Sequence, residues 1–269
     1  MITSKLKWAL SDGWVVAQRN LTHIRHVPEK LLDVTLQPLM FVLLFAYVFG
    51  GAIHVAGGGD YKEFLMAGIF VQTMAFTFMG AGMSMAEDLQ QGVVDRFRAL
   101  PMARSAVLSG RVIADFASAL IGLCVLVASG LLIGWGIHTD VLHAAAAFGI
   151  LLLFTFAILW AGTLVGMLVR APDAVQGLSF VILFPLTFLA NTFVPTAGMD
   201  KAIRTLADYN PVSAVVAALR DLFGNPTAIT DNAPWVLQHP AITAIAWSLG
   251  ILAVTVPLAI RRYQRVTTG

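Results

Sequence analysis

The sequence is short of charge. Only 12% of its 269 residues are Asp, Glu, Lys or Arg, whereas 58% are hydrophobic. A soluble domain carries about 25% charged residues, so this chain has roughly half of the charge that a water-exposed surface requires. The composition therefore excludes a soluble globular protein and predicts an integral membrane protein.

Other absences exclude chemical functions. The single cysteine, Cys124, excludes an intramolecular disulfide. The sequence has no G-x-x-x-x-G-K-[ST] motif, so it cannot hydrolyse ATP through a P-loop. His54, His138, His143 and His239 lack the spacing of paired metal ligands, and residues 177–179 lack the second glycine of a G-x-S-x-G nucleophile elbow. We therefore expect no catalytic residue, metal site or cofactor in this chain.

What the sequence does contain is a set of long apolar segments. A helix needs about 20 residues to cross a hydrocarbon core of about 30 Å. Six segments reach that length, near residues 34–53, 63–86, 112–137, 143–169, 174–194 and 241–260. The fourth and fifth are separated only by Arg170, Pro172 and Asp173, where a helix breaker lies between two charges. The prediction is an all-α integral membrane protein with six transmembrane helices over residues 34–260 and a short tail at 261–269.

Residues 1–33 have a different pattern. Leu10, Trp14, Leu21 and Ile24 recur at helical spacing, with basic and polar residues on the other faces. This favours an amphipathic helix in the membrane interface, although a helix packed on another protein would show the same pattern. The apolar residues are too interrupted for the hydrophobic core of a cleavable signal peptide.

Basic residues set the expected orientation, because cytosolic loops carry an excess of Lys and Arg. With the N-terminus inside, all of the 17 Lys and Arg residues fall on the inner side except Lys62, Lys201, Arg204 and Arg220. Both termini and the loop at residues 87–111 are therefore predicted to face the cytosol.

The long outer link, residues 195–240, contains two segments of helical character. They are 197–209 and 212–223, separated by Asn210 and Pro211. The second is apolar but only about a dozen residues long, which suits a re-entrant or interfacial segment rather than a span. A re-entrant hairpin would cap the outer end of a pathway, and a surface loop with two short helices is the open alternative.

Few polar residues lie inside the spans. Gln72, Gln176, Thr187 and Asn191 could line a passage, although hydrogen bonds between packed helices explain most such residues. No ring of acids or bases is available for a strongly charged ion, so the pattern favours a hydrophobic or amphipathic substrate. Small-xxx-small pairs, which allow close helix contact, occur at Gly130/Gly134 and Gly162/Gly166.

The most informative stretch is the loop at residues 87–111, EDLQQGVVDRFRALPMARSAVLSGR. Val93, Phe97 and Leu100 share one helical face, and the following proline should end the helix. A solvated loop would explain the arginines, but not Asp95 among them or the apolar face. The pattern predicts a short amphipathic helix that is presented to the cytosol.

Three stretches, residues 37–51, 87–111 and 210–224, resemble the membrane subunit of ABC transporters of the type-2 exporter class. The resemblance is to the daunorubicin/drug-resistance permease branch in particular. In the wider class a Thr or Ser often follows the glycine and Glu-x-Leu stands nearby. Here Val93 and Asp-Arg-Phe at 95–97 occupy those places, which favours the drug-exporter branch over polysaccharide exporters.

The resemblance implies the permease subunit of an ATP-driven exporter in a bacterial plasma membrane. It would move a hydrophobic or amphipathic compound, such as a drug, through the lipid bilayer, with no nucleic-acid partner. The loop would hold the coupling helix, which docks into a separate cytosolic ATPase subunit that binds ATP and magnesium. A second, identical permease copy would complete the passage. The implied docking residues are Glu87, Gly92, Asp95, Arg96, Phe97, Arg98, Leu100, Pro101 and Arg104.

Three rival functions carry different requirements. The same fold could export a glycan or a lipid-linked precursor. A proton-driven secondary carrier would need a buried titratable relay, whereas the mid-span regions offer only neutral polar groups. An intramembrane enzyme is disfavoured, because no histidine is expected in the bundle to activate Ser179.

Overall fold

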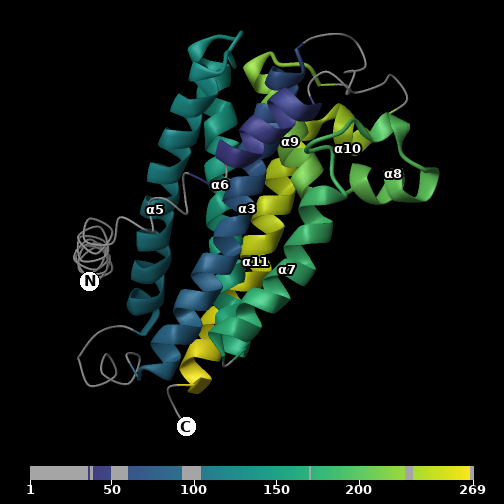
Figure 1. Cartoon of the computed structure of the whole chain (residues 1–269). Coiled ribbons are helices and arrows are strands. Elements are labelled where there is room, and N and C mark those ends of the chain that lie inside the picture. Colours follow the sequence, from purple (N-terminus) through teal and green to yellow (C-terminus); the bar gives the residue numbers. More distant parts are fainter. Residues whose placement is uncertain are drawn as a thin grey trace.

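The computed structural model describes residues 36, 39–49, 60–92, 104–169, 171–227 and 233–266. Within these ranges every regular element is helical, which confirms the all-α class. The long helices are α3 (Tyr61–Gln90), α5 (Arg104–Leu132), α6 (Val141–Leu168), α7 (Pro172–Phe188) and α11 (Pro240–Val266). The shorter ones are η1 (Leu44–Phe49), η2 (Thr196–Gly198), α8 (Lys201–Asp208), α9 (Pro211–Phe223) and α10 (Trp235–Gln238). The long helices run side by side as one bundle (Figure 1).

Four helices are long and apolar enough to cross a membrane: Tyr61–Gln90, Leu108–Leu132, Val141–Leu168 and Pro240–Gln264. They correspond to the second, third, fourth and sixth expected spans. Helix α7 corresponds to the fifth but has only 17 residues. The first expected span, 34–53, is only partly described, and the amphipathic helix expected at 1–33 lies outside the described residues.

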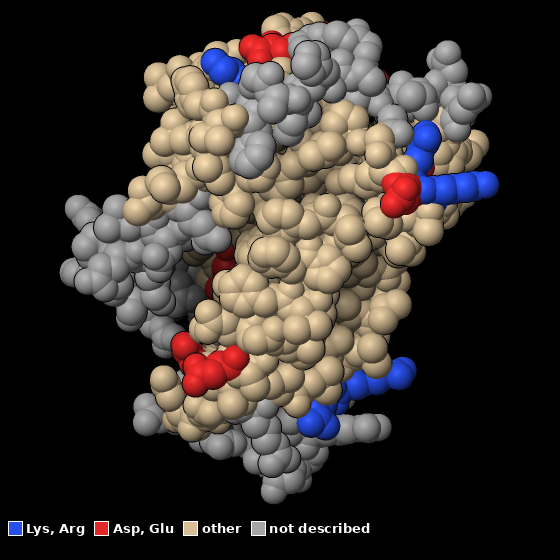
Figure 2. Space-filling view, turned by 45° about the vertical axis from the view of Figure 1, so that its right-hand side comes forward, with Lys and Arg blue, Asp and Glu red and all other residues tan. Residues whose placement is uncertain are grey.

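The bundle has two distinct ends (Figure 1). We call the end where α3 finishes and α5 begins the loop end, and the last residues of α11 lie there too. We call the opposite end the hairpin end, since it holds the connection from α7 through α8, α9 and α10. On the face drawn in Figure 2, charged side chains gather toward the ends and leave a largely uncharged surface between them. Acidic atoms set back in a recess interrupt this surface.

Glycine makes the contact between α3 and α6 close. A Cβ atom added to Gly162 would lie 2.2 Å from the carbonyl oxygen of Phe78, and one added to Gly166 would lie 2.2 Å from that of Gly82. The two backbones therefore touch, and the close contact expected of the Gly162/Gly166 pair is confirmed.

Helix α5 ends at Leu132 rather than at residue 137, because a glycine cap stops it. Gly134 has φ 99°, a conformation that favours glycine, and the Trp135 N–H donates to the Gly130 carbonyl at 3.0 Å in a Schellman-type turn. Gly130 does lie against Met66 of α3, as a small residue at a helix contact should. The same expectation is wrong for Gly134, which ends the helix instead.

Helix α7 ends at Phe188 rather than at residue 194, because the side chain of Asn210, directly before α9, caps it. The Asn210 amide donates to the carbonyls of Leu186 at 2.8 Å and Leu189 at 3.0 Å, which would otherwise lack partners at the helix terminus. The chain then bends through residues 189–194 toward α9.

The link at residues 195–240 contains a buried helix. Of the first expected helix, 197–209, only the part that forms α8 is confirmed as α-helix. Helix α9 begins at Pro211, after Asn210 has accepted a hydrogen bond from the Val212 N–H at 2.8 Å, and it packs against α3, α6 and α11. A surface position is therefore wrong for α9, and its re-entrant position in a membrane stays a prediction.

Candidate functional site

The predicted docking segment starts and finishes at the loop end. Glu87 is exposed on the last turns of α3, Gly92 follows that helix with φ 64°, and Arg104 begins α5. The other predicted docking residues lie outside the described residues: Asp95, Arg96, Phe97, Arg98, Leu100 and Pro101. The docking contacts of all nine therefore stay a prediction.

An ion-pair network joins α3 to α5 beside this segment. Arg111 of α5 donates to the carboxylate of Asp88 and to the hydroxyl of Ser84, both on α3. Its Nε atom also lies 3.6 Å from the carboxylate of Asp115, one turn further along α5. One arginine thus holds two carboxylates, and the three charged groups together carry one net negative charge. Sequence reasoning missed this network, although opposite charges flank the loop on both sides.

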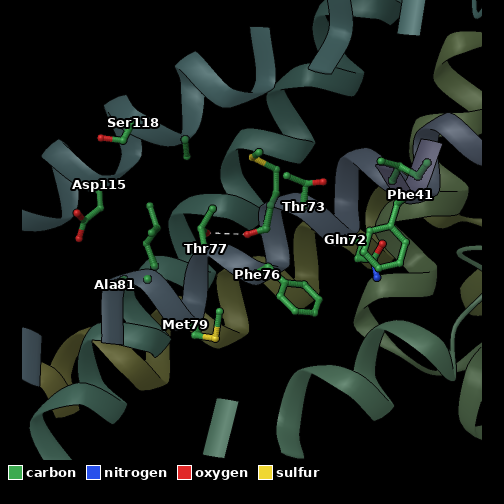
Figure 3. Close-up of a pocket in the computed structure, with 14 residues that line it drawn as sticks. Phe41, Gln72, Thr73, Phe76, Thr77, Met79, Ala81, Asp115 and Ser118 are labelled. Atoms are coloured by element: carbon green, nitrogen blue, oxygen red, sulfur yellow. Dashed lines mark hydrogen bonds between the residues drawn. The ribbon is translucent and has the colours of Figure 1, made fainter. Parts of the chain in front are cut away.

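A cavity of about 390 Å³ lies within the bundle near this network, between α3 and α5 (Figure 3). Gln72, Thr73, Phe76 and Gly80 line it from α3, where helical spacing places them on one face. From α5 come Asp115, Ser118 and Ala119, and Phe41 comes from the helical segment 39–49. The cavity therefore connects the Arg111 network to the middle of the bundle.

The polar lining of the cavity comes from Gln72, Thr73, Thr77, Asp115 and Ser118. The Thr77 hydroxyl donates to the Met74 carbonyl at 2.6 Å, and the Ser118 hydroxyl donates to the Ala114 carbonyl at 3.1 Å. Both hydroxyl protons are used within their own helices, so these oxygens can only accept. Gln72 is only 4% exposed, and its amide makes no hydrogen bond within the described part of the chain.

The other predicted passage residues lie away from this cavity. Gln176 is exposed on α7. Thr187 is fully buried and donates to the Leu183 carbonyl of its own helix at 2.7 Å. The Asn191 backbone N–H donates to the Ser213 hydroxyl at 3.1 Å, in the bend after α7. Of the four residues expected to line a passage, the structure thus brings only Gln72 to the cavity.

Arg220 forms a second polar centre, at the hairpin end. It is fully buried in α9, where its Nε atom donates to the Phe64 carbonyl at 2.8 Å and its Nη2 atom to the Thr192 carbonyl at 3.1 Å. Its guanidinium carbon lies 3.4 Å from the centre of the Phe64 ring. Burial lowers the pKa of Arg220, which lies outside the candidate spans, well below its ordinary value. No carboxylate of the described residues forms an ion pair with it.

These features define a multi-pass α-helical membrane protein with a partly polar cavity in its bundle. Comparison with known families is more specific, because the ABC-2 type transporter family matches residues 12–223. The chain belongs to the ABC-2 type transporter family and is the membrane permease of an ABC transporter.

Three relatives agree with this assignment. The daunorubicin resistance ABC transporter permease protein DrrB1 of Streptomyces coeruleorubidus is 30% identical, over 98% of this chain and 94% of its own length. The doxorubicin resistance ABC transporter permease protein DrrB of Mycobacterium tuberculosis is 28% identical, over 87% and 83% of the two chains. The probable doxorubicin resistance permease protein DrrC of that species is 23% identical, over 86% and 80%. The family expected from the sequence motifs is therefore confirmed.

Proposed function

We propose that this permease exports a hydrophobic or amphipathic compound from a bacterial cell, driven by ATP hydrolysis in a separate subunit. The observation that carries the proposal is 30% identity, over 98% of this chain, to a permease named for daunorubicin resistance. The cavity supports a substrate of this kind, because binding sites for small molecules are typically apolar with a few placed polar groups.

In the proposed arrangement six helices cross the plasma membrane and both termini face the cytosol. The segment 34–53 and α7 supply the first and fifth crossings, and α9 enters the membrane from the outer side as a re-entrant helix. The basic residues support this orientation, since an inward-facing loop end places most of them in the cytosol.

The loop at residues 87–111 would act as the coupling helix. Asp95, Arg96 and Arg98 would meet charged groups of the ATPase, while its apolar face packs into a cleft of that subunit. ATP and magnesium would bind in the partner, and a second, identical permease would complete the passage in the lipid bilayer. Movement of the coupling helix would then shift the bundle between inward-open and outward-open populations.

Co-purification tests the docking proposal. The permease is expressed with a candidate P-loop ATPase, for which the neighbouring reading frames are searched first, and is recovered from detergent through a tag on the permease. Asp95→Lys and Arg98→Glu should lose the ATPase, because each reverses a charge at the docking surface. Lys201→Glu is the matched control, since Lys201 is exposed on α8 at the hairpin end, and it should keep the ATPase. A wild-type permease that purifies alone and moves substrate under a proton gradient would support the secondary carrier instead.

Stimulated ATP hydrolysis tests the substrate class. The reconstituted complex should hydrolyse ATP faster with doxorubicin and should carry the drug into inside-out vesicles. Transport of a lipid-linked glycan precursor, with no response to amphipathic drugs, would favour the glycan exporter.

A further inference from the structure

We propose that α8 is an interfacial helix whose apolar face lies among the lipid acyl chains of the membrane leaflet at the hairpin end. In the proposed orientation this is the outer leaflet. The inference rests on the proposed crossing of the membrane by α7, but it needs neither the ATPase nor a transported compound. It assigns a lipid contact to a segment that the proposed export function leaves without a role.

The two faces of α8 differ in polarity. Ala202, Ile203 and Leu206 share one face by helical spacing, and Tyr209 continues this face past the end of the helix. The polar residues share the other side: Lys201, Arg204, Thr205 and Asp208. This separation is typical of a helix that lies between an apolar medium and water, and also of a helix that packs its apolar face on its own protein.

The burial of α8 decides between these two arrangements, because the side that packs on the protein is polar. Asp208 is only 5% exposed, and its carboxylate accepts a hydrogen bond from the Thr196 hydroxyl at 2.9 Å and lies 3.6 Å from the Nε atom of Arg204. Leu206 is instead 66% exposed, and Ile203 is exposed beside it. A surface helix in water turns its apolar face inward, so the opposite arrangement of α8 favours an apolar medium outside the protein.

The depth of α8 in the membrane follows from its link to the end of α7. Asn210, two residues after α8, donates from its amide to the carbonyls of Leu186 at 2.8 Å and Leu189 at 3.0 Å. The 17 residues of α7, at 1.5 Å each, rise about 25 Å from the start of that helix. Because a hydrocarbon core is about 30 Å thick, a helix of this length that begins at one boundary ends close to the other. This places α8 where acyl chains meet lipid headgroups.

The direction of α8 and the surface beside it also favour lipid. Helix α8 runs across the direction of the long helices (Figure 1), so it lies along the membrane plane where the bundle crosses it. Exposed apolar side chains follow α7 and the bend that joins it to α8: Val181, Phe184, Leu189 and Val194. The apolar face of α8 therefore continues a surface that acyl chains solvate in the proposed arrangement.

A second permease copy fits this face less well than lipid does. A standard protein interface buries about 800 Å² on each partner, whereas one aromatic side chain buries at most about 250 Å². The large apolar side chains of the face are only partly exposed: Ile203, Leu206 and Tyr209. Contact with lipid requires no such area, and Tyr209 suits the headgroup level, where aromatic side chains with a polar tip are enriched.

Spin labelling measures where the side chains of α8 lie. Cys124→Ala removes the native thiol, and a nitroxide is attached to Leu206→Cys or to Thr205→Cys in vesicles of phosphatidylethanolamine and phosphatidylglycerol. Collisions of each label with oxygen, which concentrates in lipid, are compared with collisions with a water-soluble nickel chelate. The ratio of oxygen to nickel collisions should be severalfold higher at Leu206 than at Thr205, because the two side chains leave the same turn toward lipid and toward water.

Leu206→Asp tests whether the apolar face holds α8 in the lipid. With a nitroxide at Ile203→Cys, Leu206→Asp should lower the ratio of oxygen to nickel collisions severalfold, because a carboxylate is costly among acyl chains. Thr205→Asp is the matched control and should leave this ratio unchanged, since Thr205 belongs to the polar side. Leu206 and Thr205 are both exposed, so neither substitution disturbs packing inside the protein.

The collision rates also identify each result that would overturn the inference. Frequent nickel collisions at Leu206 would place α8 in water. Few collisions with either reagent would mean that protein covers Leu206, as a second permease copy would. A label at Val181→Cys, in the middle of α7, separates this failure from a failure of the proposed crossing. An oxygen-rich Val181 with a nickel-rich Leu206 would overturn the role of α8 alone, whereas nickel-rich labels at both would overturn the crossing by α7 as well.

Discussion

Arg220 is held by two backbone carbonyls rather than by a carboxylate, and this makes a sharp prediction at the residue scale. Its Nε and Nη2 atoms reach carbonyls on separate segments, Phe64 of α3 and Thr192 after α7. Lysine keeps the charge but lacks the planar fork that reaches both. We expect Arg220→Lys to cost about 2 kcal/mol of stability, which is a fall of several degrees in the melting temperature. Thermal unfolding in detergent, read by size-exclusion chromatography, measures this.

The control for Arg220 is Arg204→Lys on α8. Arg204 is partly exposed and lies 3.6 Å from Asp208, so the substitution should change stability by less than about 0.5 kcal/mol. Equal melting temperatures for the two lysine variants would show that the paired hydrogen bonds of the buried Arg220 guanidinium contribute nothing to stability.

The Arg111 network predicts an asymmetry between its members. Asp88→Asn leaves Arg111 with Asp115, so it should cost only about 0.5 kcal/mol at this partly exposed site. Arg111→Gln removes the side chain that contacts both Asp88 and Asp115 and should cost about 1–2 kcal/mol. Melting temperatures of the two variants at low salt provide the measurement. The reverse order would mean that Arg111 does not serve both acids.

Sequence reasoning finds isolated residues better than their partners. Gln72 can be found because a polar side chain stands out in an apolar span, and it does line the cavity. The position of Asp115 opposite Gln72 depends on how α5 packs on α3. The expected order of spans places Arg220 on the outer side, and its burial depends on contacts with α3 and with the bend after α7.

At the element scale, the two glycines of α6 that touch α3 should tolerate no side chain. In Gly162→Ala the new Cβ atom would lie 2.2 Å from a backbone oxygen of α3, so the helices must separate. We expect a loss of about 2 kcal/mol, in the range of other overpacked cores. Gly149→Ala in the same helix meets nothing within 4 Å and should stabilise the protein by about 0.5–1 kcal/mol. Similar melting temperatures for both variants would contradict the close α3–α6 contact.

The presence of helices was easier to predict than where they end. Apolar length alone predicts the four candidate spans. The end of α5 at Gly134 has a local signal, since glycine favours positive φ. The end of α7 has no local sequence signal, because Asn210, which caps it, lies at the start of α9. Tertiary contacts, rather than local pattern, thus set the boundaries that the sequence misplaces.

At the scale of the whole molecule, the described helices constrain the number of membrane crossings. Helices α3, α5, α6, α7 and α11 follow one another in alternating direction (Figure 1). If each crosses the membrane, the chain changes side an odd number of times between the start of α3 and the C-terminus. Termini on the same side therefore require one further crossing before α3, by the segment 34–53. The six-span prediction thus depends on where the N-terminus lies.

Labelling of single cysteines with a membrane-impermeant maleimide tests this arrangement in cells. Cys124→Ala first removes the native, exposed thiol. Lys201→Cys, at the hairpin end, should be labelled in intact cells. Asp173→Cys, at the start of α7 near the loop end, should be labelled only after the cells are permeabilised. Ser4→Cys should behave like Asp173→Cys, because an inward N-terminus follows from the distribution of Lys and Arg. Labelling of Ser4→Cys in intact cells would contradict the predicted crossing by residues 34–53. Equal labelling of Lys201→Cys and Asp173→Cys would mean that the 17 residues of α7 do not span the membrane.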